Sequence, residues 1–526
     1  MASLSEKDYQ QGQAMLFPAN IATLIPSNHL VRVVNNFVDE LDLSGLRATF
    51  SGGGAQCYHV GMMLKVLLYG YCEKIYSSRQ IAKALRENIN FMWLSAFQKP
   101  NFRTINRFRC KHAGKELEQI FAGLVESLLD SGHISFENYF IDGTKIEANS
   151  NKFKYVWKAN SKRYHENVKQ KIREILDEVS RIDAEDDKRY GDNDLPEVNV
   201  GEHITSEMIK ERVKKIKLEM PPPTEKPVKR KEKKDPRQGL LKFLEKDLLP
   251  RLEKYEEQLC ILGDRRSYSK TDPDAIFMRL KEDSLQNGQL KAAYNFQIGT
   301  ENQFILGFSV HAQSGDTKTL QPHLNKLENE LGFLPDRIIA DAGYGSEENY
   351  SHLKKLGLEA VIKYNTYDKQ QKKSFKSKVF HIDNFFYDEK HDYFQCPAGR
   401  KLLKIRDKKE RTDAGYMRNL AEYSCDNCNE CEMKSQCTKA KGDRILSFSR
   451  SGYFLRKEMR EKLSSEEGKA IYARRKIEPE SVFGNIKQNM GFKRLSLRGL
   501  RGAEIELGLI SMAHNLRKRF KMANIS

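Results

Sequence analysis

A chain of 526 residues is longer than one compact domain of ordinary size, so roughly three or four structural units are expected. Hydrophobic residues make up 39% of the chain and aromatic residues 10%, which excludes global disorder although 31% of the residues are charged. The 90 Lys and Arg residues exceed the 72 Asp and Glu residues, and the net charge of +18 is spread along the chain, which favours an extended polyanion such as nucleic acid over merely solvated basic faces.

The opening segment MASLSEKDYQQGQAMLFPAN has no basic region followed by an apolar stretch, as a secretory signal would. No later apolar run approaches the ~20 residues that span a bilayer. We therefore expect a cytoplasmic, nucleoid-associated protein without a membrane partner. Nine cysteines suit a reducing compartment, where clustered thiols bind metals more readily than they form disulfides.

Helical periodicity runs from about Leu16 to Leu129 and predicts an all-helical N-terminal domain. Within it, a break at Lys99 and Pro100 separates two short helical segments. This pattern is typical of a helix-turn-helix, whose second helix reads DNA, although an ordinary helical hairpin has the same pattern. The side chains that this second helix would present to DNA are Arg103, Asn106, Arg107 and Arg109.

A strand-like run ends at Asp142 and is followed by a long charged stretch with two apolar stripes at helical spacing, from Tyr164 to Ile182 and from Leu241 to Leu262. The Pro- and Lys-rich segment MPPPTEKPVKRKEKKDP separates the stripes, which predicts an inserted helical hairpin with a basic middle. The stripes are most simply a packing seam between helices.

Strand patterns resume with LKAAYNFQIGT and NQFILGFSVHAQS, which predict a hairpin turning near Glu301 and Asn302. A predicted helix, DTKTLQPHLNKLENELG, leads into the apolar strand of DRIIADAGYG, which ends at Asp341. Strand, hairpin, helix and strand follow one another as in a ribonuclease H-like α/β core with a mixed sheet.

Two acids follow apolar strands and precede small residues, Asp142 before Gly143 and Asp341 before Ala342. Phosphodiester transfer with two divalent cations needs converging carboxylates, and hard oxygen ligands suit Mg²⁺. A single Asp-Gly more often caps a turn. The pair therefore predicts a two-Mg²⁺ site, with a third acid still to be found.

The C-terminal segment IYARRKIEPESVFGNIKQNMGFKRL combines acids, bases and aromatics in a helical context. Glu480 and Lys487 are seven residues apart and share one side of a helix, where the acid would bind metal and the lysine would hold a substrate phosphate. Because Pro479 is tolerated only at the first turn, the helix should begin near it. Glu478 is the rival third acid.

With the segments IDGTKIEAN, DAGYGSEEN and ESVFGNIKQNMGFKRL, the chain resembles the bacterial insertion-sequence DDE transposases that share a Tyr-Arg-Glu-Lys signature. The resemblance implies a ribonuclease H-like catalytic core, Mg²⁺, and binding of terminal inverted repeats with DNA cleavage and strand transfer by a dimer on DNA. By position, it assigns the catalytic and metal-binding roles to Asp142, Asp341 and Glu480 and the lysine of the signature to Lys487.

The signature is not matched throughout. Its arginine falls on Lys476 and its tyrosine on Ala473, while Arg475 and Tyr472 are each one residue away. We expect Arg475, Lys476 and Lys487 to contact DNA.

The implied organisation is α/β and multidomain. It consists of an all-helical N-terminal DNA-binding domain (1–130), the first core strand (131–151), a charged helical insertion (152–270), the continued core (271–365), a small Cys-rich insertion (366–460) and the C-terminal core helices (461–526).

Five cysteines at short spacing predict a structural metal site in the Cys-rich insertion. Zn²⁺ on four thiolates is the preferred interpretation, an iron–sulfur cluster or free thiols being the alternatives. His381 and His391 lie close in sequence but are more typical of surface histidines. The expected ligands are Cys425, Cys428, Cys431 and Cys437, with Cys396 as the competitor for one position.

Three functions compete at this point. An active transposase would cut and rejoin DNA, a ribonuclease H-like nuclease would cut without rejoining, and an inactive relative would only bind. The apparently intact Asp142, Asp341 and Glu480 argue against the last. Repeat sequence, target preference, excision route and oligomeric state off DNA do not follow from these residues.

Overall fold

The computed structural model describes residues 20–50, 56–151, 154–190, 204–219, 236–280, 290–412 and 415–524. The chain divides into two compact units, Met1–Glu147 with Tyr294–Ser526, and Ala148–Ala293. The predicted α/β class, with a mixed sheet and a helical N-terminal region, is confirmed. Within these ranges no helix is both long and apolar enough to cross a membrane.

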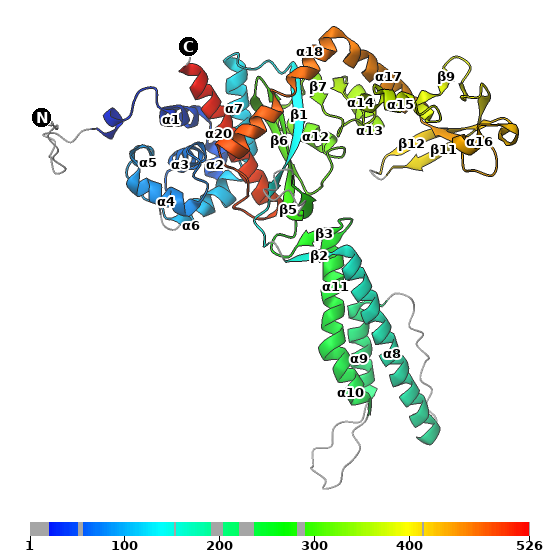
Figure 1. Cartoon of the computed structure of the whole chain (residues 1–526). Helices are drawn as coiled ribbons and strands as arrows, with labels where there is room; N and C mark the ends of the chain where they lie inside the picture. The colour runs from blue at the N-terminus through cyan, green and yellow to red at the C-terminus, as the bar shows by residue number, and fades with distance from the viewer. Residues whose placement is uncertain are drawn as a thin grey trace, which may run out of the picture. The chain divides into compact units, whose positions relative to one another are not determined.

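The N-terminal region is helical up to Asp130, and its core forms around α3 (Val60–Cys72), in which all but one residue is buried. A helix this apolar must be covered on every side. The C-terminal helix α20 (Gly499–Ala523) supplies part of the cover by packing on α3, on α7 and on the sheet (Figure 1). The other elements are η1 (Ile21–Leu24), α1 (Leu30–Glu40), α2 (Ser44–Ala48), α4 (Ser78–Glu87), α5 (Ile89–Leu94), α6 (Phe102–Arg107), η2 (Phe108–Ala113) and α7 (Leu117–Asp130).

The central sheet has six strands, in the order β4-β5-β1-β7-β8 with β6 also paired to β5. Strand β4 (Ile276–Arg279) pairs only with the first residues of β5, Leu290–Ala293. Strands β1, β7 and β8 run parallel, and β5 and β6 form an antiparallel hairpin. Its strands are apolar and buried because helices cover them, among them α12 (Leu320–Leu331) and α13 (Glu347–Lys355). The bounds are β1 (Asn138–Glu147), β5 (Leu290–Glu301), β6 (Phe304–His311), β7 (Arg337–Ala340) and β8 (Glu359–Ile362).

The predicted hairpin, the helix after it and the strand before Asp341 are present, although the strand ends at Ala340. The hairpin turns through Asn302 and Gln303, which have φ values of 49° and 59°. Positive φ at both central residues matches the right-handed twist of the paired strands.

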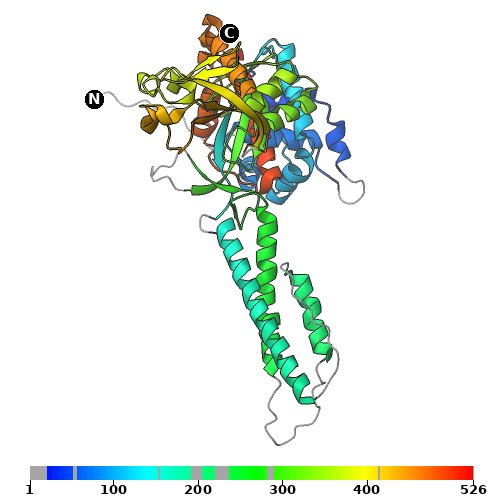
Figure 2. The ribbon, with the colours of Figure 1, turned by 90° about the vertical axis from the view of Figure 1, so that its right-hand side faces the viewer.

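The second unit contains the predicted helical stripes, α8 (Lys158–Tyr190) and α11 (Leu249–Leu262), which lie side by side (Figure 2). Val168, Ile172 and Leu252 are buried in their shared core, so the stripes do form a packing seam. The basic segment 220–235 lies outside the described residues. The unit also contains α9 (Ser206–Glu219), α10 (Pro236–Phe243), η3 (Leu244–Leu248), β2 (Tyr155–Trp157), β3 (Ser267–Ser269) and β4 (Ile276–Arg279).

After β8, short helices lead into an antiparallel five-stranded sheet with the order β13-β12-β11-β10-β9 and its own aromatic core. The chain then returns through helices to the central sheet. These elements are α14 (Tyr367–Gln370), α15 (Lys373–Lys376), η4 (Ile382–Asn384), β9 (Phe386–Asp388), β10 (Tyr393–Gln395), β11 (Lys401–Arg411), β12 (Met417–Cys425), η5 (Cys428–Glu430), α16 (Lys434–Cys437), β13 (Ile445–Phe448), α17 (Arg450–Ser464), α18 (Glu466–Arg474), α19 (Pro479–Gly484) and η6 (Asn485–Asn489).

Candidate active site

Asp142 and Asp341 occupy equivalent positions on two neighbouring parallel strands. The register pairs Phe140 of β1 with Ile339 of β7. Asp142 lies two residues further along β1, which does not end there as predicted but continues to Glu147. Asp341 lies two residues after Ile339, just beyond the end of β7. Strand β7 ends at Ala340, so both carboxylates lie where these strands part. Such strand ends are where open α/β sheets form ligand crevices.

The small residues after the aspartates are required by close approach. A Cβ added to Gly143 would lie 2.2 Å from Gln297 Nε2 and 2.8 Å from Asp316 Oδ1, inside any real contact distance. Backbone amides also hold the carboxylates, since the N–H of Gly143 donates to Asp142 Oδ1 (2.8 Å) and that of Gly343 donates to Asp341 Oδ1 (2.7 Å). The two acids are therefore fixed by their own backbone turns.

Arg475 connects the first acid to the C-terminal segment. Its guanidinium lies 3.5 Å from Asp142 Oδ2 and 3.1 Å from Glu480 Oε1. The structure thus brings Glu480 to the strand-end aspartates through one arginine, the residue one position from where the signature places it. Burial lowers the pKa of this guanidinium, but the nearby Asp142 and Asp341 raise it, and the net shift is upward.

Negative charge accumulates around Asp142. Burial raises the pKa of Asp142 to about 6, with Asp341 and Asp316 adding to the rise and Arg475 opposing it. An added cation would relieve this charge, because a nearby positive charge favours the ionised carboxylate.

The two candidate third acids differ in environment. Glu480 is in the first turn of α19, and its side chain is 48% exposed. Glu478 is buried and accepts from the backbone N–H of Gln303 (2.7 Å) in the β5–β6 turn, with Arg474 3.4 Å away. Glu478 therefore binds the hairpin turn, whereas Glu480 faces Arg475. The predicted start of this helix at Pro479 is confirmed.

Lys487 lies in the π-helical turn η6 and is 7% exposed. A π-helical turn holds more residues than an α-helical turn, so the seven-residue spacing from Glu480 no longer amounts to two α-helical turns. The seven-residue spacing between Glu480 and Lys487 in the sequence gives no sign of this turn.

Asp316, in the loop after β6, belongs to the same cluster but was not predicted. It accepts hydrogen bonds from Asn295 Nδ2 (2.7 Å) and Gln297 Nε2 (3.0 Å), and Gln297 accepts from the buried hydroxyl of Tyr344. A third acid in the loop after a core strand, in SGDTKT, was the available signal.

Among the described residues, no group of three or more His, Cys, Asp or Glu side chains is arranged to hold a metal ion. This holds for the clustered cysteines as well as for the acidic cluster, where the Arg475 guanidinium lies beside both Asp142 and Glu480. The donor set itself, carboxylate oxygens with excess negative charge, fits Mg²⁺.

The predicted DNA-reading segment is α6 and the π-helix η2 after it. Arg103, Asn106 and Arg107 are exposed there. Arg109 is not: it is 3% exposed and lies 3.8 Å from the buried carboxylate of Glu506 on α20. The expectation that Arg109 contacts DNA is therefore wrong for this structure, because its guanidinium is buried and paired with Glu506.

Replacing Arg109 with alanine should lower the free energy of unfolding by about 3–5 kcal/mol, because Glu506 would be left buried without its cation. Arg103→Ala on the exposed face of α6 should change it by less than about 0.5 kcal/mol. Urea unfolding of both variants measures the difference. Equal, small effects would show that the buried pair is not needed for stability.

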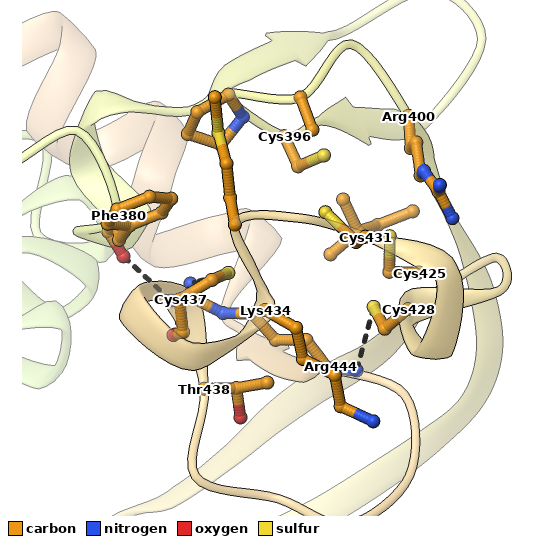
Figure 3. Close-up of a pocket in the computed structure, with 14 residues that line it drawn as sticks. Phe380, Cys396, Arg400, Cys425, Cys428, Cys431, Lys434, Cys437, Thr438 and Arg444 are labelled. Atoms are coloured by element: carbon orange, nitrogen blue, oxygen red, sulfur yellow. Dashed lines mark hydrogen bonds between the residues drawn. The ribbon is translucent and has the colours of Figure 1, made fainter.

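The five clustered cysteines line one small pocket beside β11 and β12 (Figure 3). Burial raises the pKa of the Cys425 thiol to about 12, with Cys428 and Cys396 adding to the rise, so these three thiols are neighbours. The guanidinium of Arg444 lies 2.8 Å from the sulfur of Cys437, whereas the backbone N–H of Arg444 donates to the sulfur of Cys428 (3.4 Å). His391 is exposed and paired with Asp388, and His381 caps η4.

Comparison with protein families gives two matches. Residues 395–520 match a family described as a transposase DDE domain, and residues 19–111 match one described as a transposase domain (DUF772). The chain is therefore a transposase. The two matches, one toward each end, identify it as an insertion-sequence DDE transposase. No curated protein matched the chain.

Proposed function

We propose that this transposase binds the terminal inverted repeats of its insertion sequence and catalyses DNA cleavage and strand transfer at the acidic cluster. The observation that carries this proposal is the equivalent placement of Asp142 and Asp341 on neighbouring parallel strands, with Glu480 joined to Asp142 through Arg475. The antiparallel β5–β6 hairpin beside the parallel strands β1, β7 and β8 supports a ribonuclease H-like core.

In this proposal Asp142, Asp341 and Glu480 hold two Mg²⁺ ions. Bound divalent cations supply activation of the attacking oxygen and stabilisation of the leaving oxygen. Other groups of the chain position the carboxylates and the substrate. The Gly143 and Gly343 amides fix the two aspartates, and Arg475 is near enough to pair with a substrate phosphate once the carboxylates have another cation.

Recognition of the element ends is assigned to the N-terminal helices. Arg103, Asn106 and Arg107 present two cations and an amide on one short exposed segment, the side-chain types that contact phosphates and base edges. We expect two copies of the chain to act together on the two ends, as a dimer on DNA in the cytoplasm.

The test is incubation of the purified protein with a labelled DNA fragment that carries the gene's own flanks, with Mg²⁺ or with EDTA. Cuts at both flanks and joined products, present only with Mg²⁺, are the expected result. Nicking without joined products would indicate a nuclease. Binding without any cut would contradict the catalytic proposal.

We also propose a structural Zn²⁺ in the Cys-rich region, which would fasten η5 and the turn after β10 to β12. We favour Cys396, Cys425, Cys428 and Cys431 as the ligands over a set that includes Cys437. The sulfur of Cys437 lies against the cationic guanidinium of Arg444, which would oppose a second cation there. Four thiolates match the tetrahedral preference of Zn²⁺.

Metal analysis of purified protein should find about one zinc per chain, lost in Cys396→Ser and retained in Cys437→Ser. The matched pair separates the two ligand sets, because each variant removes one thiol from the same pocket. Equal zinc loss in both variants would contradict the proposed set. Metal-free protein, or iron in place of zinc, would contradict the zinc proposal.

A further inference from the structure

A groove of about 990 Å³ lies beside the acidic cluster. It is bounded by the segment after β8, by α14, and by helices α17 and α18. Arg475 belongs to both regions, because it lines the groove and also contacts Asp142 and Glu480. Tyr472, three residues before it, lines the same part of the groove. One end of the groove therefore opens at the proposed catalytic carboxylates.

The lining of this groove is strongly basic. Six lysine and arginine side chains face two acids, Asp368 and Asp383. Asp368 is already paired with Lys363, whose Nζ lies 2.9 Å away, so it neutralises only part of the positive charge. The basic residues are Lys363, Lys376, Arg460, Lys469, Arg475 and Lys476.

An aromatic ring stands at the end of the groove nearest the acids. Tyr472 is partly exposed, and Lys363 Nζ lies 4.7 Å from its ring centre. Arg475 lies against the same ring at 5.9 Å. A tyrosine ring flanked by cations in a basic groove is the combination by which proteins hold single-stranded nucleic acid, with phosphates on the cations and a base on the ring.

The size of the groove limits what it can hold. Pockets of about 300–1,000 Å³ enclose a ligand of drug size, which corresponds to a few nucleotides and not to a turn of duplex. A duplex could rest across the groove but could not fill it.

We propose that this groove binds a short unpaired stretch of one DNA strand next to the phosphate that reacts. Lys469 and Lys476 are exposed on α18 and just after it, and they would pair with successive phosphates of that strand. Lys469 would exchange its exposed partner Glu466, 3.0 Å away, for a phosphate. The inference rests on the proposed function, because the groove would hold the part of the DNA strand that leaves the acidic cluster.

The experiment measures binding of the full chain to a fluorescent single-stranded oligonucleotide of about ten nucleotides at several salt concentrations. The double variant Lys469→Ala with Lys476→Ala should bind at least about tenfold more weakly, and its salt dependence should be shallower by about 1.4 in slope, or about 0.7 per lost phosphate contact. Lys355→Ala on α13, exposed and outside the groove lining, is the matched control and should leave both quantities unchanged.

Cleavage of the flank-bearing duplex by the same proteins separates this inference from the proposed function. Weakened oligonucleotide binding in the groove variant supports the inference, whether or not the wild type cuts DNA. Unchanged affinity and unchanged salt slope would overturn it, even if the wild type cuts DNA as proposed. Equal weakening in Lys355→Ala would also overturn it, since the effect would then reflect general charge.

Discussion

Asp341→Asn should abolish DNA cleavage while leaving DNA binding and thermal stability close to those of the wild type. The amide keeps the shape of the side chain, and its oxygen can still accept the hydrogen bond from the Gly343 N–H. What is lost is a negative charge at the site proposed for two divalent cations. Because such cations contribute several kcal/mol to transition-state stabilisation, we expect a rate loss of about a thousandfold or more.

The measurement is the rate of strand cutting at the element ends in Mg²⁺, beside the affinity for the same DNA. Asp336→Asn is the matched control, because Asp336 is exposed just before β7, at the opposite end of that strand from Asp341. The control should cut at the wild-type rate. Substantial cleavage by Asp341→Asn would remove this residue from the catalytic set.

The second prediction separates the two glutamates that flank Pro479. Glu480→Gln should abolish cleavage without changing stability, because the side chain is half exposed and faces Arg475. Glu478→Gln should lower the free energy of unfolding by about 1–3 kcal/mol, because a buried carboxylate that accepts from the Gln303 N–H and lies beside Arg474 is replaced. It should retain cleavage at temperatures where it is folded.

Cleavage rates and thermal melts of the two variants decide the matter together. The opposite pattern, with cleavage lost in a stable Glu478→Gln and kept in Glu480→Gln, would make Glu478 the third acid. Loss of cleavage in both folded variants would mean that the link between the hairpin turn and α19 is itself needed to place Glu480.

Features set by local sequence were predictable. The β5–β6 hairpin follows from two apolar runs around a short polar turn, and the start of α19 follows from the fixed φ of Pro479. The end of β7 just before Asp341 likewise needed only an apolar run followed by small residues. In each case the residues that make the sequence pattern lie within a few residues of the element that they predict.

Features that depend on distant partners were not predictable. Arg109 has the sequence context of a DNA-contacting residue, and only the fold shows that Glu506 from the far end of the chain neutralises it. Asp316 lies in a loop whose place beside Asp142 is set by the sheet. The π-helical turn that contains Lys487 changes the α-helical geometry assumed for the spacing from Glu480.

The position of α20 has a consequence for biosynthesis. Helix α20 lies far C-terminal to α3 and α7, which it covers, and is therefore synthesised well after them. During translation the apolar surfaces of α3 and α7 that α20 covers therefore remain exposed for a time. Exposed apolar surface of this kind makes a chain prone to aggregation and dependent on chaperones. A product that stops before Gly499 would lack both this cover and the partner of Arg109, so prematurely terminated chains should not accumulate as folded competitors for the element ends.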